Sequence, residues 1–175
     1  MIYQPSDDSY LLATQVKKLS KGKKVLDIGS GSGIQALAAK KAKALSVLAT
    51  DINPEAIKHL KFLNLKAIKS NLFSKVKGKF DLIIFNPPYL PEDKREPKDS
   101  RLATTGGKQG DETILKFLKQ AQKHLAKNGI ILLVVSSLTP KKRIHSALKE
   151  LNLEKHCIKK KAFFFESLEV WELSR

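Results

Sequence analysis

The amino-acid sequence predicts an α/β domain with a mainly parallel sheet and helices on both faces. Three observations lead to this fold class. Strand and helix signals alternate along the chain, as they do in βαβ units. A glycine-rich loop at residues 29–33 follows the first predicted strand, where such folds make their first βα turn. The apolar run at 130–135 is continuous, which is typical of a central strand covered on both faces.

The predicted elements cover most of the chain. The strands are expected at residues 25–28, 46–50, 65–68, 80–85 and 130–135, with a final hairpin of residues 153–158 and 164–173. The helices are expected at residues 34–43, from Pro54 onward, at 111–127 and at 140–151. No internal repeat or linker interrupts this order, so residues 1–175 are expected to form one domain.

Turn and cap residues set the boundaries of these elements. Asn53 is suited to cap a helix whose first position is taken by Pro54, because the fixed φ of proline matches that place. The pair Asn128-Gly129 is expected to stop the helix that precedes it. Residues 90–110 are rich in proline, glycine and charge without an apolar period, and so long a structureless loop is usually functional.

Composition excludes several classes of protein. Hydrophobic residues make up 42% and charged residues 29% of 175 residues, a globular composition. No apolar run approaches the about 20 residues of a membrane span, and the start does not read as a signal peptide. The single cysteine, Cys157, excludes an internal disulfide and is expected to be a buried small hydrophobe. A cytoplasmic location follows by default.

The formal net charge of +16 is spread along the chain in lysine clusters. A basic surface favours nucleic acid or a ribonucleoprotein, so RNA or the ribosome is expected nearby. A solvated lysine-rich surface of thermophilic type explains the same charge equally well. The four histidines are scattered without metal-ligand spacing, and no metal site is predicted.

The strand at 80–85 ends in Asn86-Pro87-Pro88-Tyr89. Two consecutive prolines lack N–H donors and stiffen the chain into an extended ledge. Its carbonyls and the Asn86 amide are expected to point outward, with an aromatic ring beside them. Such a ledge suits a planar –NH2 group, which needs two acceptors in its plane. An ordinary strand-ending turn is the alternative interpretation.

The glycine loop indicates a ligand that approaches the backbone closely. Its spacing is G-x-G-x-G, and Ile34 stands where a dinucleotide-binding motif has its last glycine, which weakens that interpretation. Asp51 ends the next strand about twenty residues on, where a carboxylate binds ribose hydroxyls. Asp27, just before the loop, favours a ligand with an ammonium group over a pyrophosphate.

These motifs together resemble the class I S-adenosylmethionine-dependent methyltransferases, and among them the HemK-related release-factor glutamine methyltransferases. Residues 3–12 (YQPSDDSYLL), from Tyr3 to Leu12, are similar to the Y-x-P-[AS]-[ED]-D-[ST]-x-L-L start of the eukaryotic and archaeal branch. Residues 105–110 (TGGKQG) resemble the G-G-x-x-G loop of that branch. The resemblance implies a Rossmann-like, mostly parallel seven-stranded sheet with a C-terminal antiparallel hairpin, and S-adenosyl-L-methionine as cofactor.

The resemblance also implies roles for individual residues. The implied cofactor-binding residues are Ser9, Asp27, Gly29, Gly31, Gly33, Asp51, Ile52, Asn71, Leu72 and Asn86. The implied catalytic residues are Asn86, Pro87, Pro88 and Tyr89. Asn71 departs from the family, which often has aspartate there. Residues 1–20 would cover substrate and cofactor, and residues 90–110 would be the active-site loop.

The expected activity is methylation of the glutamine amide in the Gly-Gly-Gln motif of a translation release factor. Accepting both N–H groups of the carboxamide would aim its nitrogen at the methyl group, so catalysis is mostly positioning. The expected partners are the release factor and a small zinc-binding activator protein at a sheet edge near Leu60–Phe73. A nucleobase N-methyltransferase and a non-catalytic nucleic-acid binder are the alternatives.

Overall fold

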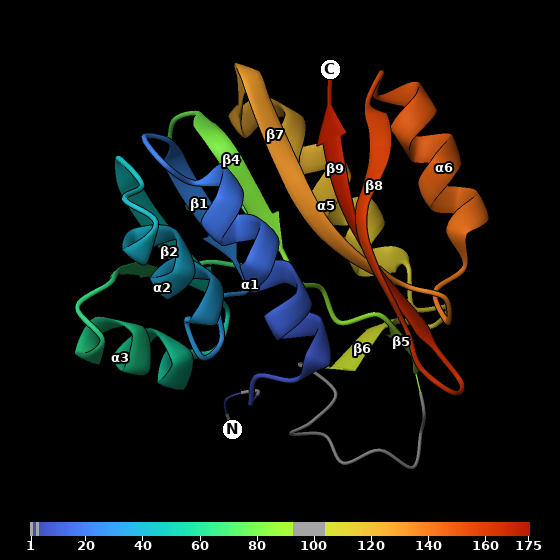
Figure 1. The fold of residues 1–175 in the computed structure, drawn as a ribbon, viewed down its shortest axis with the longest axis horizontal. Helices are drawn as coiled ribbons and strands as arrows, with labels where there is room; N and C mark the ends of the chain where they lie inside the picture. Colours follow the sequence, from blue (N-terminus) through green and yellow to red (C-terminus); the bar gives the residue numbers. More distant parts are fainter. Residues whose placement is uncertain (1, 3, 93–103) are drawn as a thin grey trace.

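The computed structural model describes residues 2, 4–92 and 104–175, and its centre is a seven-stranded sheet (Figure 1). The spatial order is β3-β2-β1-β4-β7-β9-β8. The strands are β1 (Lys24–Ile28), β2 (Ser46–Asp51), β3 (Lys66–Lys69), β4 (Phe80–Phe85), β7 (Leu125–Ser136), β8 (Glu154–Ala162) and β9 (Ser167–Ser174). Within this sheet β9 alone runs opposite to the other six strands, which confirms the predicted fold class with its C-terminal antiparallel hairpin.

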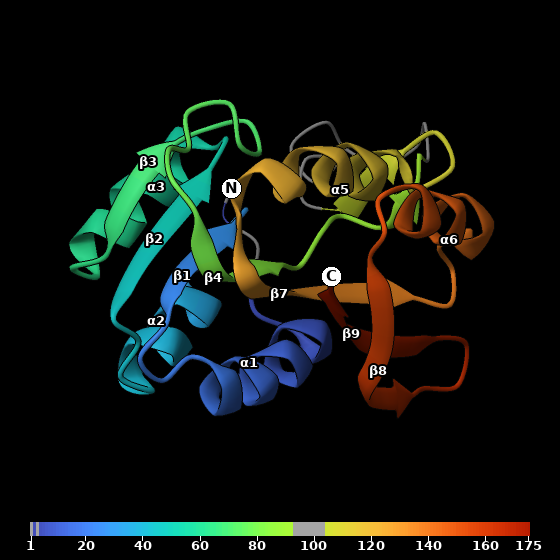
Figure 2. The ribbon, with the colours of Figure 1, turned by 90° about the horizontal axis from the view of Figure 1, so that it is seen from above.

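Helices cover both faces of this sheet (Figure 2). One face carries α1 (Asp7–Leu19), α2 (Ile34–Lys41) and α3 (Pro54–Phe62). The other carries α5 (Glu112–His124) and α6 (Lys141–Glu150). Strand β7 is buried between them: Ile131 packs on the α5 side and Leu132 on the α1 side, which confirms the two-sided burial predicted from the apolar run.

The strand register brings three polar strand ends together. Ile28 of β1 pairs with Thr50 of β2 and with Phe85 of β4, so the residues that follow these strands lie side by side. The chain order reverses between β1 and β4, since β2 and β3 extend one way from β1 and β4 and β7 the other. In open α/β sheets such a switch point opens a crevice at the carboxyl ends of the strands, where ligands bind.

Two predicted boundaries were wrong. The helix expected at 111–127 ends at His124, and β7 begins at Leu125, ahead of Asn128-Gly129. Leu125 is fully buried and pairs with Phe80, so strand pairing overrides the local stop signal. Asn128 and Gly129 instead lie in β7 where its register against β4 shifts. On β4 this shift falls between Phe80, which pairs with Leu125, and Leu82, which pairs with Ile130.

The region 90–110 is not entirely without structure. Strands β5 (Leu90–Pro91) and β6 (Thr105–Gly107) pair in parallel as a small second sheet. Residues 93–103, most of the predicted active-site loop, lie outside the described residues, as does Tyr3 of the predicted N-terminal motif.

Cys157 was also predicted wrongly, because it is exposed on β8. Strand β8 is an edge strand whose side chains are exposed at nearly every position, so a small apolar residue there has no core to enter. No helix of the described chain is long and apolar enough to cross a membrane.

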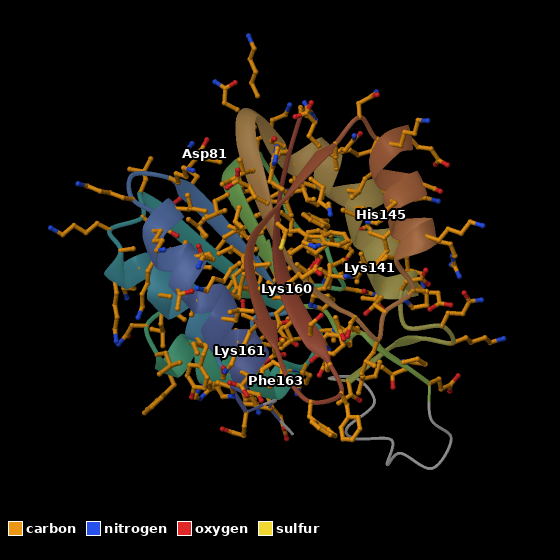
Figure 3. All side chains as sticks on the ribbon, turned by 45° about the vertical axis from the view of Figure 1, so that its right-hand side comes forward. Asp81, Lys141, His145, Lys160, Lys161 and Phe163 are labelled. Atoms are coloured by element: carbon orange, nitrogen blue, oxygen red, sulfur yellow. The ribbon has the colours of Figure 1, made fainter. Side chains whose placement is uncertain are left out.

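Helix α1 was not predicted from the sequence. Asp7 and Asp8 occupy its first turn and Lys17 and Lys18 its last, an arrangement that complements the helix dipole. The N-terminal end of α1 is joined to the C-terminal hairpin by an ion pair between Asp7 and Lys161, 2.6 Å apart. Figure 3 shows Lys161 and Phe163 on the hairpin close to this end of α1, and the Lys161 ammonium lies 4.9 Å from the Phe163 ring centroid.

The only tryptophan of the chain, Trp171, lies fully buried in β9. Its indole Nε1 donates a hydrogen bond to Glu169 at 2.7 Å. The Lys155 ammonium lies 4.6 Å from the ring centroid, and His145 of α6 stacks on the ring with 5.5 Å between the ring centroids. Trp171 therefore joins β8, β9 and α6 into one packed unit.

Candidate active site

A cavity of about 1220 Å³ opens at the carboxyl ends of β1, β2 and β4. Ligand pockets in proteins usually measure about 300–1,000 Å³, so this one has room for an extended ligand and part of a second one. Two groups of residues line it, and they are named here by their strands. The β1–β2 side comprises residues 27–31, 51–54 and 70–72. The β4 side comprises residues 86–89 together with Asp8, Ser9, Thr105 and Gly107.

Asp51 organises the β1–β2 side. Its Oδ2 accepts a hydrogen bond from the Gly31 N–H at 2.8 Å, and its Oδ1 accepts one from the Asn53 N–H at 2.8 Å. A carboxylate has about four lone-pair sites, so two backbone donors leave acceptor capacity for a ligand. The Asp51 carboxylate thus shapes the glycine loop and also presents acceptors beside Ile52 in the cavity.

Asp27 is a buried acid that lines the same side. Its Oδ2 accepts a hydrogen bond from the Ala36 N–H at 3.1 Å. Burial raises the pKa of Asp27 from 3.8 to about 7, and the nearby Asp51 charge acts in the same direction. A cationic group brought into the cavity would favour the ionised form, so the site suits an ammonium ligand.

The turn after β3 completes the β1–β2 side. The Ser70 hydroxyl donates to the Leu72 carbonyl at 2.8 Å, and the Asn71 N–H donates to the Ser74 hydroxyl at 3.2 Å. These bonds hold Leu72 in a left-handed conformation with φ of 47°. Asn71 and Leu72 both line the cavity.

Gly33 stands apart from the other predicted cofactor residues, because it does not line the cavity. It precedes α2 with φ of 82°, and a Cβ there would lie 2.8 Å from a methyl carbon of Leu60. The space that a side chain at position 33 would need is therefore occupied by Leu60 of α3, which packs against the loop. Gly29 and Gly31 do line the cavity, with φ of 64° and 51°.

Asn86 is the central residue of the β4 side. Its Nδ2 donates a hydrogen bond to Asp8 Oδ2 at 3.0 Å. Its Oδ1 is buried and has no hydrogen-bond partner among the described residues. A buried acceptor without a partner is costly and calls for an explanation, and a ligand N–H in the cavity would supply the missing donor.

Residues 87–89 continue the ledge and contact the second glycine motif. A Cβ on Gly106 would lie 2.7 Å from the Pro88 carbonyl oxygen, and one on Gly110 would lie 2.7 Å from that of Tyr89. The Thr139 hydroxyl donates to the Tyr89 carbonyl at 3.3 Å. Glycines 106 and 110 are thus needed for the backbone of 105–110 to pack on the ledge.

Among the cavity residues not predicted from the sequence, Asp8 and Gln35 form buried hydrogen bonds that build the site. Asp8 lies next to the predicted Ser9, and only its contact with Asn86 reveals its place in the site. Gln35 is buried and donates from Nε2 to the Ser9 carbonyl at 2.9 Å, while its Oε1 has no partner among the described residues. The acid at position 8 is part of the motif at residues 3–12, which was the one available signal.

The residues present fit a ligand with an ammonium group, hydroxyls and a nearby –NH2 acceptor. Asp27 suits the ammonium group and Asp51 the hydroxyls. The buried Asn86 Oδ1, which has no partner in residues 2, 4–92 and 104–175, suits the –NH2 group. Within the described residues, no group of three or more His, Cys, Asp or Glu side chains is placed to hold a metal ion.

Comparisons with known proteins show the family of this chain. The family model of the methyltransferase small domain matches residues 6–165. The Methanocaldococcus jannaschii protein named "Putative protein N5-glutamine methyltransferase" is 38% identical over 98% of this chain and 92% of its own. The release factor glutamine methyltransferase of Aquifex aeolicus is 36% identical over 78% of this chain, and the match spans 52% of that enzyme.

Among solved structures, the E. cuniculi Mtq2–Trm112 complex, described as methylating the termination factor eRF1, has the same fold. Its TM-score is 0.81 at 22% identity, with 99% of this chain and 98% of that one covered.

The fold and the cavity define a class I S-adenosylmethionine-dependent methyltransferase. The chain belongs to the methyltransferase small domain family, and the predicted enzyme class and cofactor are thereby confirmed.

Proposed function

We propose that this protein transfers a methyl group from S-adenosylmethionine to the side-chain amide nitrogen of a glutamine in a translation release factor, in the Gly-Gly-Gln motif. The observation that carries the proposal is the buried Asn86 Oδ1 at the end of a proline ledge, for which the described part of the chain supplies no hydrogen-bond partner. An –NH2 group has two donors, and Asn86 Oδ1 with the Pro87 carbonyl supplies two acceptors. The names of the M. jannaschii and A. aeolicus relatives support the same acceptor.

The β1–β2 side would hold the cofactor. Asp27 would face its amino group, Asp51 its ribose hydroxyls, and Asn71 and Leu72 its adenine, while Gly29 and Gly31 let it approach the backbone. Ser9 and Ile52 line the same cavity and would complete the contact. When bound, S-adenosylmethionine supplies a methyl group made electrophilic by the sulfonium.

The β4 side would hold the acceptor. A carboxamide nitrogen is a poor nucleophile because its lone pair is delocalised into the carbonyl. Accepting both N–H groups fixes the amide plane, so that the nitrogen lone pair, which is perpendicular to that plane, faces the methyl group. These hydrogen bonds also enrich the lone pair, so the protein contributes chiefly positioning. The Tyr89 ring would form a wall beside the amide plane. The described parts of residues 1–20 and 90–110 would contact the ligands, because Asp8, Ser9 and Thr105 line the cavity.

The test is transfer of a labelled methyl group to a purified release factor, to its Gly-Gly-Ala variant and to RNA. We expect label only in the Gly-Gly-Gln protein. Asn86→Ala should lower turnover by about 100-fold or more with cofactor affinity nearly unchanged, as expected for a lost transition-state contact. Asn128→Ala, remote from the cavity, is the matched control. Label in RNA alone would replace the proposal with a nucleobase methyltransferase, a role that the charge of +16 suits.

We further propose that a small zinc-binding activator protein docks at the edge of the sheet near residues 60–73. Strand β3 is an edge strand, and edges accept strand addition. Two large apolar side chains near it are exposed, Phe62 by 84% and Leu45 by 67%. The fold likeness to Mtq2, solved as a complex with Trm112, supports a small partner protein. With a release factor as substrate, the protein would work in the cytoplasm.

This second proposal is tested by co-purification with a small zinc-binding protein of the same organism. Phe62→Asp should abolish the complex. Phe164→Asp should leave it intact, because Phe164 is equally exposed, by 90%, but lies in the β8–β9 hairpin. A monodisperse and fully active protein without any partner would contradict the proposal.

A further inference from the structure

Asp8 is an acid in an unexpected setting. It lies in the first turn of α1 and is only 4% exposed, whereas Asp7 beside it is half exposed and pairs with Lys161. Burying a carboxylate is costly unless hydrogen bonds offset the lost hydration. Asp8 accepts from the Ser9 hydroxyl at 3.0 Å and from Asn86 Nδ2 at 3.0 Å. The second of these contacts joins segments 78 residues apart and has no role in forming the helix.

The contact fixes which end of the Asn86 amide faces the cavity. An asparagine amide has a donor end and an acceptor end, and a rotation of half a turn about the last side-chain bond exchanges them. An ionised carboxylate only accepts hydrogen bonds. If the amide were reversed, Oδ1 would oppose Asp8 Oδ2, and the –NH2 group would point into the cavity. The acid at position 8 therefore selects the orientation in which Oδ1 is available.

We infer that Asp8 is a positioning residue: it holds Asn86 so that the site presents an acceptor, and it thereby selects –NH2 acceptor substrates over carbonyl ligands. This inference rests on the proposed function, in which the acceptor group is an amide nitrogen. With Asn86 reversed, two –NH2 groups would meet donor to donor. The negative charge on Asp8 also polarises the Asn86 amide and strengthens Oδ1 as an acceptor, since linked hydrogen bonds reinforce one another.

Asp7 and Asp8 allow a matched test. Both are acids in the first turn of α1, so the alanine variant of either removes one charge from the same helix end. Only Asp8→Ala removes the partner of Asn86. Asp8→Asn keeps the shape and still offers an oxygen to Asn86 Nδ2, which makes it the conservative variant if Asp8→Ala does not fold.

The expected kinetic result is a loss of turnover of about 100-fold in Asp8→Ala, the scale of misplacing a reacting group by about 1 Å. Cofactor affinity should stay within about threefold, Asp8→Asn should recover part of the turnover, and Asp7→Ala should match the wild type. In the Asn86→Ala background, Asp8→Ala should have almost no further effect, because the two residues act as a unit. Additive losses in the double variant would overturn the inference.

A second readout does not depend on methyl transfer. The side-chain ¹⁵N–¹H₂ resonances of Asn86, assigned through Asn86→Ala, should move when Asp8 becomes alanine or asparagine and stay in place in Asp7→Ala. Unmoved resonances in Asp8→Ala would overturn the inference even in an active enzyme. If the wild type transfers no methyl group to a release factor, the proposed function fails, while the resonances still decide whether Asp8 orients Asn86.

Discussion

The two sides of the cavity differ in how far apart in the sequence their contacting residues lie. The β1–β2 side is held by contacts within residues 27–74, such as Gly31 to Asp51, Ala36 to Asp27 and Ser70 to Leu72. The β4 side joins Asn86 to Asp8, Tyr89 to Thr139 and Gly106 to Pro88, so it depends on segments from the whole chain. The comparison indicates that the two sides can be perturbed separately: one should govern cofactor affinity and the other turnover.

On the β4 side, the largest effect expected from a residue other than Asn86 and its partner Asp8 is that of Gly106→Ala. A Cβ there would lie 2.2 Å from the Gly110 carbonyl oxygen and 2.7 Å from that of Pro88, both rigid backbone atoms. Turnover should fall by about 100-fold as the ledge moves. Overpacking should also cost about 1–3 kcal/mol of stability. The measurements are single-turnover transfer and thermal unfolding.

The control is Gly22→Ala, where φ is 70° and no atom lies within 4 Å of the new Cβ. The left-handed backbone alone should cost about 1–2 kcal/mol there. Turnover should be unchanged. Equal turnover losses in both variants would show that general destabilisation, and not the ledge, limits the reaction.

On the β1–β2 side, Asp51→Ala should lower cofactor affinity by about 100-fold. It removes hydrogen bonds to a charged group, each worth about 1.5–3 kcal/mol, that hold the glycine loop at Gly31 and Asn53. Turnover at saturating cofactor should change little, and calorimetry with turnover assays separates the two quantities.

The matched control for Asp51 is Asp81→Ala, because Asp81 also accepts from a backbone N–H, that of Lys24, at 2.9 Å. Asp81 lies in β4 but outside the cavity lining. A comparable loss of cofactor affinity in Asp81→Ala would contradict the separation of the two sides.

A smaller, pH-dependent effect is expected from Asp27, whose pKa burial raises to about 7. A cationic ligand group favours the ionised carboxylate, so cofactor affinity should rise about tenfold from pH 6 to pH 8. In Asp27→Asn the affinity should be nearly flat across this range. Calorimetric titrations at several pH values check both, and a wild-type affinity independent of pH would argue against an ammonium group at Asp27.

The same pKa affects the ligand-free protein. Between pH 3.8 and about 7 the folded state keeps a proton on Asp27 that the unfolded chain has lost. The unfolded state then binds fewer protons, so the contribution of Asp27 to stability falls as pH rises through this window. Asp27→Asn should remove that contribution, which chemical denaturation at several pH values would show.

The smallest effect on function is expected from Gly33→Ala. Its new Cβ would lie 2.8 Å from the end of the flexible Leu60 side chain, in a backbone with φ of 82°. Stability should fall by about 1–3 kcal/mol. Cofactor affinity should change by less than about threefold, because Gly33 does not line the cavity. A larger loss of affinity would return Gly33 to the cofactor site.

The same division explains what the sequence could predict. The glycine loop and Asp51 are close in sequence and follow two consecutive strands, so their meeting could be predicted from spacing and the rule of parallel sheets. The contact between Asp8 and Asn86 spans 78 residues and depends on how α1 packs on the sheet. Nothing in the local pattern specifies that packing.

The structure also differs from the sequence prediction at helix α1 and at Asn128-Gly129. Helix α1 had readable signals, namely the acids of its first turn, the lysines of its last and the apolar Leu12 and Val16 at helical spacing. The pair Asn128-Gly129 was read as a helix stop, yet a Cβ on Gly129 would lie 2.9 Å from the Phe80 carbonyl. The glycine serves a close approach between strands, which local turn chemistry does not reveal.

The buried Trp171 gives the protein a built-in optical probe. As the single tryptophan, it reports only on the unit formed by β8, β9 and α6, and its fluorescence depends on the cations and the imidazole around the indole. Unfolding followed by tryptophan fluorescence should coincide with the loss of circular dichroism only if the hairpin unfolds together with the rest of the sheet. If fluorescence changes first, the C-terminal hairpin is an independently opening unit, and its opening would break the ion pair between Lys161 and Asp7 at the N-terminal end of α1.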